Sequence, residues 1–208
     1  MELKIKNLTK KFGDITVLND ISLSMESGKI YGFVGRNGCG KTMLMKHILG
    51  MVYPTSGSVL IDGKELGKDI DLPPSAGAII ENPGFLPEFS GYKNLKLLAM
   101  IKGKIGKKEI IETMERVGLD PYNRKRVKKY SLGMRQRLGL AQAIMENPDL
   151  LILDEPMNGL DYEGVEEIRK LLLSQKKEGK LLIIASHNRE DIHLLCDEIF
   201  EMDNGTLI

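Results

Sequence analysis

Residues 35–42 read Gly-Arg-Asn-Gly-Cys-Gly-Lys-Thr and fit the pattern G-x-x-x-x-G-K-T. The segment before them, 29–34, is typical of a strand, and 43–49 continues as a helix that ends at Gly50. In such a strand-to-helix turn, glycines let backbone N–H groups surround phosphate oxygens, and the helix dipole adds positive potential. A glycine-rich turn without a ligand is the alternative, but it leaves the aligned lysine and threonine unexplained. The loop therefore predicts binding of a nucleoside triphosphate.

The loop supplies most of the expected nucleotide ligands. Lys41 is expected to reach the β- and γ-phosphates, and the Thr42 hydroxyl to ligate Mg²⁺. Cys39 is either a small filler residue or a reactive thiol near a helix N-terminus. The candidate ATP-binding residues of this segment are Gly35, Arg36, Asn37, Gly38, Cys39, Gly40, Lys41, Thr42 and Met43.

Composition narrows the class of protein. The chain has 208 residues, enough for one core or a core with a small attached lobe. Its net charge of +1 gives no electrostatic argument for nucleic acid as a main partner. The longest apolar runs, such as 150–153 and 181–185, are far shorter than the ~20 residues that span a bilayer and suit buried parallel strands. Two cysteines make no disulfide framework, which favours the cytoplasm.

The order of elements predicts an α/β fold with a mostly parallel, twisted sheet. Short alternating strands are expected within 1–34, followed by strands at 57–63 and 76–80. Between about 90 and 146 the apolar spacing becomes helical, which predicts a helical lobe inserted into the core. A strand at 150–153, a helix at 162–177, a strand at 181–185, a helix at 190–195 and a short strand at 199–202 complete the prediction.

A second group of polar residues follows the strand 150–153. Asp154 is expected beside the phosphate loop, where it can hold Mg²⁺ through its water shell, and Glu155 can polarise a water for attack on the γ-phosphorus. The alternative is a strand end with two solvated acids. His187 follows the strand 181–185 at the expected edge of the sheet, which suits a γ-phosphate contact, although such a histidine is often structural.

The order of these motifs resembles the nucleotide-binding subunit of ABC transporters along essentially the whole chain. The match rests on the phosphate loop, Tyr130-Ser-Leu-Gly-Met-Arg-Gln-Arg137, Asp154-Glu155, Asn158-Gly-Leu-Asp161 and Ser186-His187. It implies a P-loop NTPase (RecA-like) core, an N-terminal antiparallel β-subdomain and an inserted α-helical subdomain. We expect a single domain, 1–208, with the core at about 1–85 and 146–208 and the helical subdomain at about 86–145.

The resemblance implies further site residues. Ser131 and Gly133, at the head of a helix, would bind the γ-phosphate held by a partner subunit, and Asp161 joins the nucleotide-binding set. The signature departs from the family's usual Leu-Ser-Gly-Gly-Gln, because Leu132 and Met134 replace a glycine and the glutamine. Ser131 is also a good helix N-cap, which is compatible with that role. Phe12 would stack on adenine, with core filler as the alternative.

Glu81 stands where the family usually has glutamine. The segment Ile80-Glu-Asn-Pro-Gly-Phe85, followed by Gly91-Tyr-Lys-Asn-Leu95, resembles the bacitracin-resistance and lantibiotic self-protection branch of ABC exporters. A carboxylate at this position is a candidate Mg²⁺ ligand beside Thr42 and Asp154, although it adds negative charge near the triphosphate. We expect altered Mg²⁺ dependence rather than loss of function.

The resemblance implies an ATP hydrolase that works with other chains. The expected partners are a second ATPase subunit, in a homodimer or heterodimer, and an integral membrane permease, at the inner face of the cell membrane; nucleic acid is not expected. The implied cargo is an antimicrobial peptide or drug. The alternatives are a soluble ABC-type ATPase acting on ribosomes or DNA, and a nucleotide sensor without turnover. The basic run 124–129 is interpreted as a solvated face.

Overall fold

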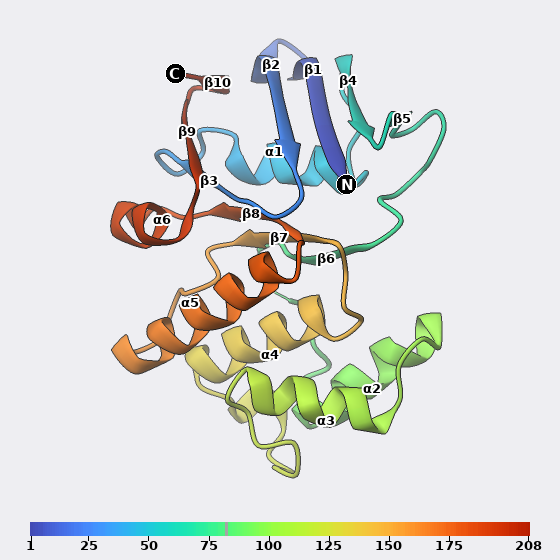
Figure 1. Ribbon diagram of the computed structural model, residues 1–208, viewed down its shortest axis with the longest axis vertical. Coiled ribbons are helices and arrows are strands. Elements are labelled where there is room, and N and C mark those ends of the chain that lie inside the picture. The colour runs from blue at the N-terminus through green and yellow to red at the C-terminus, as the bar shows by residue number, and fades with distance from the viewer. Residues whose placement is uncertain (82) are drawn as a thin grey trace.

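The phosphate-binding loop follows a strand in the middle of a six-stranded sheet of the computed structural model, which describes residues 1–81 and 83–208 (Figure 1). The strand order is β10-β9-β3-β8-β7-β6. Five neighbouring strands run parallel, and β10 is antiparallel to β9. The bounds are β3 Ile30–Val34, β6 Ala76–Ile79, β7 Leu150–Asp154, β8 Leu181–Ala185, β9 Glu198–Asp203 and β10 Thr206–Leu207.

The register of the central strands gathers the predicted site residues. Ala185 at the end of β8 pairs with Phe33 of β3 on one side and with Asp154 of β7 on the other. Because parallel strands end at the same edge of a sheet, the segments that follow β3, β6, β7 and β8 meet there. The phosphate loop and the two acids are therefore neighbours although more than a hundred residues separate them.

An antiparallel sheet of four strands forms the N-terminal subdomain, in the order β2-β1-β4-β5. Its strands are β1 Glu2–Phe12, β2 Ile15–Glu26, β4 Ser56–Ile61 and β5 Lys64–Glu65. The expectation of short strands was wrong here, because β1 and β2 form one long hairpin. Register shifts interrupt the hairpin, and the left-handed residues Asn7 and Asp20 (φ 45° and 51°) lie at these breaks. A bulge switches the inward face, so that Leu18 rather than Val17 is buried with Ile21.

Seven helical segments complete the described chain (Figure 1). Each face of the six-stranded sheet carries its own core, as expected for strands that are buried on both sides. Ile30 and Val34 of β3 face α4, α5 and the helical lobe, whereas Tyr31 and Phe33 face α1 and the antiparallel sheet. The segments are α1 Lys41–Ile48, α2 Gly91–Lys102, α3 Lys107–Arg116, the 3-10 turn η1 Val127–Lys129, α4 Leu132–Ile144, α5 Tyr162–Lys177 and α6 Arg189–Leu195.

The predicted fold class is confirmed: a P-loop core with a mostly parallel sheet, an antiparallel β-subdomain and an inserted helical lobe. The first helix of the lobe, α2, begins at Gly91, because the Ser90 hydroxyl accepts a hydrogen bond from the Lys93 amide and caps it. The strand β10 was not predicted. Among the helices that the structure describes, none is long and apolar enough to cross a membrane.

The edge strand β6 is covered by the C-terminal half of α4, which packs directly on its backbone. A Cβ atom added to Gly77 would lie 1.8 Å from the Ala143 carbonyl oxygen and 2.9 Å from Cγ of Pro148. Only glycine permits this close approach, which joins the helical lobe to the sheet.

We expect Gly77→Ala to lower the free energy of unfolding by about 3 kcal/mol, because the added methyl group forces α4 away from β6. Chemical denaturation checks this value. Gly84→Ala is the matched control, since a Cβ there meets no atom within 4 Å. Equal stability of the two variants would contradict the close packing of α4 on β6.

Candidate nucleotide-binding site

A cavity of about 470 Å³ opens at the edge where the parallel strands end. It lies between the phosphate loop, the start of α1, the end of β7 and the first turn of α4. The residues that line it are Val17, Asn37, Gly38, Gly40, Lys41, Thr42, Met43, Lys46, Glu81, Leu132, Gln136, Asp154, Glu155 and Asn158. Most of the predicted phosphate-loop residues are thus brought together around one space with Glu81, Asp154 and Glu155.

The loop backbone depends on glycine at the point where α1 begins. Gly40 is the N-cap of α1 in a left-handed conformation (φ 109°), and a Cβ there would lie 2.8 Å from Cδ2 of Leu18. Glycine both adopts this conformation without strain and leaves room for the hairpin strand behind it. The first residues of α1 line the cavity, where the helix dipole favours an anion.

Lys41 is 93% buried within the curve of the loop, being 7% exposed. Its ammonium donates to the carbonyl oxygens of Gly35 at 2.7 Å and of Arg36 at 3.1 Å. A buried ammonium held by neutral carbonyls is an unpaired positive charge, which an anion entering the cavity would neutralise. The donor set of the loop therefore fits a polyphosphate.

Cys39 packs beneath this ammonium, with its Sγ atom 3.7 Å from Nζ of Lys41. It is only 5% exposed and belongs to the core on the α1 side of the sheet. The structure thus favours the interpretation of Cys39 as a small filler residue over that of an accessible reactive thiol.

Thr42 and Asp154 are joined across the base of the cavity. The Thr42 hydroxyl donates to Oδ2 of Asp154 at 2.6 Å. Burial raises the pKa of the Asp154 carboxyl above its ordinary value, while the Thr42 hydrogen bond acts in the opposite direction. A hydroxyl and a half-buried carboxylate are hard oxygen donors, which suits Mg²⁺.

Glu155 is fixed at both of its carboxylate oxygens. Oε1 accepts a hydrogen bond from the His187 backbone N–H at 2.8 Å, and Nδ1 of His187 lies 2.8 Å from the same oxygen. Oε2 accepts from the Ser186 hydroxyl at 3.0 Å. The residues that follow β8 therefore fix the orientation of the Glu155 carboxylate, and His187 is its direct neighbour.

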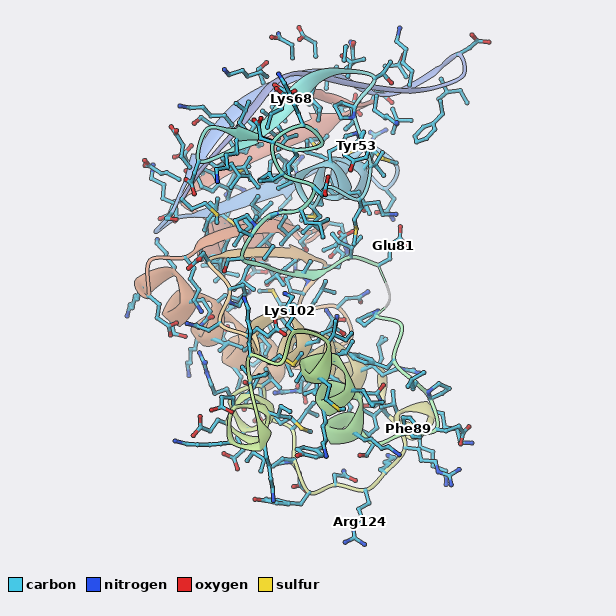
Figure 2. All side chains as sticks on the ribbon, turned by 90° about the vertical axis from the view of Figure 1, so that its right-hand side faces the viewer. Tyr53, Lys68, Glu81, Phe89, Lys102 and Arg124 are labelled. Atoms are coloured by element: carbon cyan, nitrogen blue, oxygen red, sulfur yellow. The ribbon has the colours of Figure 1, made fainter. Side chains whose placement is uncertain are left out.

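Glu81 lines the cavity, and its carboxylate forms an ion pair there with Lys46. Its Oε1 accepts from Nζ of Lys46 at 2.6 Å, and its side chain is 63% exposed. Figure 2 shows Glu81 on the side of the molecule, between the strand-rich part near Tyr53 and the helical part near Phe89. Lys46, which lies one helical turn after Thr42 on α1, was missed by the sequence analysis. Asn82, the next residue, lies outside the described part of the chain.

Gln136 belongs to the segment 130–137 that carries the family resemblance, but it was not predicted as a site residue. Its side-chain Nε2 donates to the Glu155 carbonyl oxygen at 2.9 Å, so that α4 contacts the acid directly. The spacing from Ser131 places Gln136 on α4, but no local pattern signals its long-range partner.

Phe12 and Asp161 lie outside the lining of the cavity. Phe12 is 50% exposed, with the Lys10 ammonium 4.8 Å from its ring centroid, so the core-filler alternative is excluded. Asp161 caps α5 by accepting a hydrogen bond from the Gly164 amide at 3.0 Å. The exposed ring of Phe12 remains accessible to a ligand or a partner surface.

Of the predicted signature residues, Ser131 and Gly133 also lie outside that lining, whereas Leu132 between them contributes to it. Ser131 caps α4 by accepting a hydrogen bond from the Met134 amide at 3.1 Å. Gly133 lies against the backbone of Gly159, where an added Cβ would be 3.0 Å from the carbonyl oxygen. The segment 131–134 therefore packs on the loop that follows Glu155, and Ser131 stays exposed.

Arg36 and Gly35 of the phosphate loop line a different cavity, of about 450 Å³, together with His187.

Comparisons with known proteins agree with this geometry. The family model described as ABC transporter matches residues 18–158. The ABC transporter cassette MJ0796, solved as a dimer, superimposes with a TM-score of 0.88 at 23% identity, covering 99% of this chain and 96% of that chain. At this level of identity the likeness concerns the fold.

Curated relatives match at higher identity over nearly the whole chain. The uncharacterised ABC transporter ATP-binding protein YybJ of Bacillus subtilis is 48% identical, over 99% of this chain and 94% of its own length. The bacitracin transport ATP-binding protein BcrA of Enterococcus faecalis is 45% identical, over 99% and 68%. The lantibiotic transport ATP-binding protein SrtF of Streptococcus pyogenes is 40% identical, over 99% and 89%. The chain therefore belongs to the ABC transporter family, as its ATP-binding and ATP-hydrolysing subunit.

Proposed function

We propose that this ATPase uses Glu155 as the general base that activates the attacking water, with His187 as its orienting neighbour. The observation that carries the proposal is that both carboxylate oxygens of Glu155, which lines the cavity, are held by hydrogen bonds. A base held in one orientation reduces the reorganisation needed to reach the transition state.

Lys41 and Thr42 hold the triphosphate in this proposal. The Lys41 ammonium exchanges its bonds to the loop carbonyls for phosphate oxygens, and the N–H groups at the start of α1 bind the same anion. Thr42 and Asp154 hold Mg²⁺, with Glu81 as a further ligand. Mg²⁺, when bound, supplies positive charge that stabilises the developing charge on the phosphates.

The exposed predicted residues support a shared site. Ser131 and Phe12 are exposed and lie outside the lining of the cavity, so both are accessible to a nucleotide held by a second ATPase subunit. The dimeric state described for the MJ0796 cassette supports this arrangement. We propose that ATP is bound between two subunits, each giving its phosphate loop to one nucleotide and its signature helix to the other.

A groove supports the proposal of a membrane permease as partner. A cavity of about 430 Å³ is lined by Pro83, Phe85, Pro87, Val127, Lys128, Leu132, Arg135 and Gln136. It combines apolar walls with the basic side chains Lys128 and Arg135, so it suits a cytoplasmic helix of the permease. We propose that this contact holds the chain at the inner face of the cell membrane. We also propose that residues 1–208 form one domain, in which the helical subdomain spans about 86–145 and the core forms the rest.

The names of the relatives support a peptide cargo. BcrA is a bacitracin transport protein and SrtF a lantibiotic transport protein, and both are at least 40% identical over nearly the whole chain. We propose export of an antimicrobial peptide or drug.

In the basic run 124–129, Arg126 and Lys128 both pair with Glu88, at 2.9 and 2.7 Å, which supports a solvated face rather than a nucleic-acid surface.

Glu155→Gln is expected to bind ATP within about threefold of the wild-type affinity and to lose turnover by about 10²–10⁴-fold, because only the general base is removed. With ATP and Mg²⁺ it should change from monomer to dimer in light scattering. Glu115→Gln, on the exposed face of α3, is the control and should turn over normally. A wild-type rate for Glu155→Gln excludes Glu155 as the base.

Glu81→Gln should fold normally and need more Mg²⁺, whereas Lys46→Met should need less, because it frees the Glu81 carboxylate from its ion pair. The measurement is the Mg²⁺ titration of the binding of a fluorescent ATP analogue. A titration that is unchanged in both variants removes Glu81 from the surroundings of the metal.

Asp154→Asn should raise the melting temperature in the absence of nucleotide. The folded state raises the pKa of Asp154 above 3.8, so ionisation of the carboxyl destabilises the fold increasingly as the pH rises above 3.8, and fully above the raised pKa. The advantage of the variant should grow as the pH rises from 3.8 through the raised pKa and then stay constant.

The Asp154→Asn variant should also lose the stabilisation given by ATP with Mg²⁺, which is about 2.7 kcal/mol for a ligand at 100 times its Kd. Thermal unfolding with and without the nucleotide measures both effects. A variant that is less stable than the wild type without nucleotide contradicts the assigned cost of burying the charge.

A further inference from the structure

Gln136 connects the catalytic acid to the helical subdomain. It lies in the second turn of α4, which Figure 1 shows beneath the sheet and beside α5, and its amide donates to the Glu155 carbonyl oxygen at 2.9 Å. The acceptor is a carbonyl, so the NH₂ group of the side chain must face it. Gln136 also lines both the nucleotide cavity and the groove that contains Pro83 and Phe85.

Glu155 needs such support because its backbone is in an unfavourable conformation. Its φ is 50°, in the left-handed region that residues with a Cβ rarely adopt. Such a residue keeps its geometry only when its surroundings hold it. The turn after β7 is therefore a place where losing one contact can change the direction of a side chain.

Three sets of contacts hold Glu155, and they come from different parts of the fold. The β8 strand bonds its N–H, through the Ala185 carbonyl at 2.8 Å, and the residues after β8 bond its carboxylate. Its carbonyl accepts from the Asn158 amide at 3.2 Å and from Gln136. Of these donors, Gln136 alone belongs to α4.

We propose that Gln136 is a positioning residue, which links the position of α4 at the groove to the orientation of the Glu155 carboxylate. A displacement of α4 by a partner in the groove would stretch the bond to the Glu155 carbonyl and let the turn after β7 relax. The rate of ATP hydrolysis then depends on whether a partner occupies the groove. The inference rests on the proposed role of Glu155 as the general base.

The test is steady-state ATP hydrolysis by Gln136→Leu, which keeps the size of the side chain and removes its donor. Because one hydrogen bond is lost, kcat should fall about tenfold, while KM for ATP stays within about twofold. Gln136→Glu, which is isosteric but turns an acceptor toward the carbonyl, should fall at least as far. A purely structural role would instead lower thermal stability and leave kcat unchanged.

Gln142→Leu is the matched control, since Gln142 is also half-buried on α4 but lines a separate cavity with Leu98 and Pro148. It should keep the wild-type kcat. If Gln136→Leu also keeps the wild-type kcat, or if Gln142→Leu loses as much, the inference is overturned.

The double variant Gln136→Leu with Glu155→Gln separates the inference from the proposed function. If Gln136 acts through Glu155, its removal should not lower the residual turnover of Glu155→Gln any further. A further tenfold loss would show that Gln136 acts elsewhere and overturn the inference alone. A wild-type rate for Glu155→Gln by itself would overturn the role of the base and the inference with it.

Discussion

The site depends on the parallel hydrogen bonding of β8 between β3 and β7. Ala185 pairs with Phe33 on one side and with Asp154 on the other, so the phosphate loop, the acids and the segment Ser186-His187 leave the sheet at the same level. A slip of one residue would turn each side chain to the opposite face of the sheet. The two buried cores, one on each face, fix this register and thereby place Glu155 within hydrogen-bonding distance of His187.

The cavity carries both positively and negatively charged side chains, which suit an anionic ligand that brings a metal ion with it. Lys41 is buried against neutral carbonyls, and Asp154 is half-buried with its pKa raised by that burial. Each charge is costly in the free protein, and each becomes favourable when an opposite charge arrives. Glu81 adds a second carboxylate, and the Lys46 ammonium compensates for it at 2.6 Å. The glutamine-to-glutamate departure is thus accompanied by a cation within the same cavity.

The helical subdomain contacts the catalytic site through α4. Gly77 lets α4 pack directly on the backbone of β6, and Gln136 of the same helix bonds the Glu155 carbonyl. The packing at Gly77 makes α4 part of the core. The hydrogen bond from Gln136 lets the first turns of α4 affect the backbone of Glu155, which is strained. A helix that is anchored at its C-terminal half and exposed to a groove at its N-terminal half is suited to convey a partner's position.

The sequence by itself determined the phosphate loop, the acids after an apolar strand, the helical lobe and the family, because each is written in adjacent residues or in a fixed order of motifs. It left open whether Phe12 is buried, and it misjudged the length of β1 and β2, because bulges at Asn7 and Asp20 interrupt the alternation that marks a strand. Only the tertiary structure decided that Lys46 meets Glu81 and that Gln136 meets Glu155. These partners lie 35 and 19 residues apart along the chain, and contacts across such distances depend on how sheets and helices pack, which no local pattern encodes.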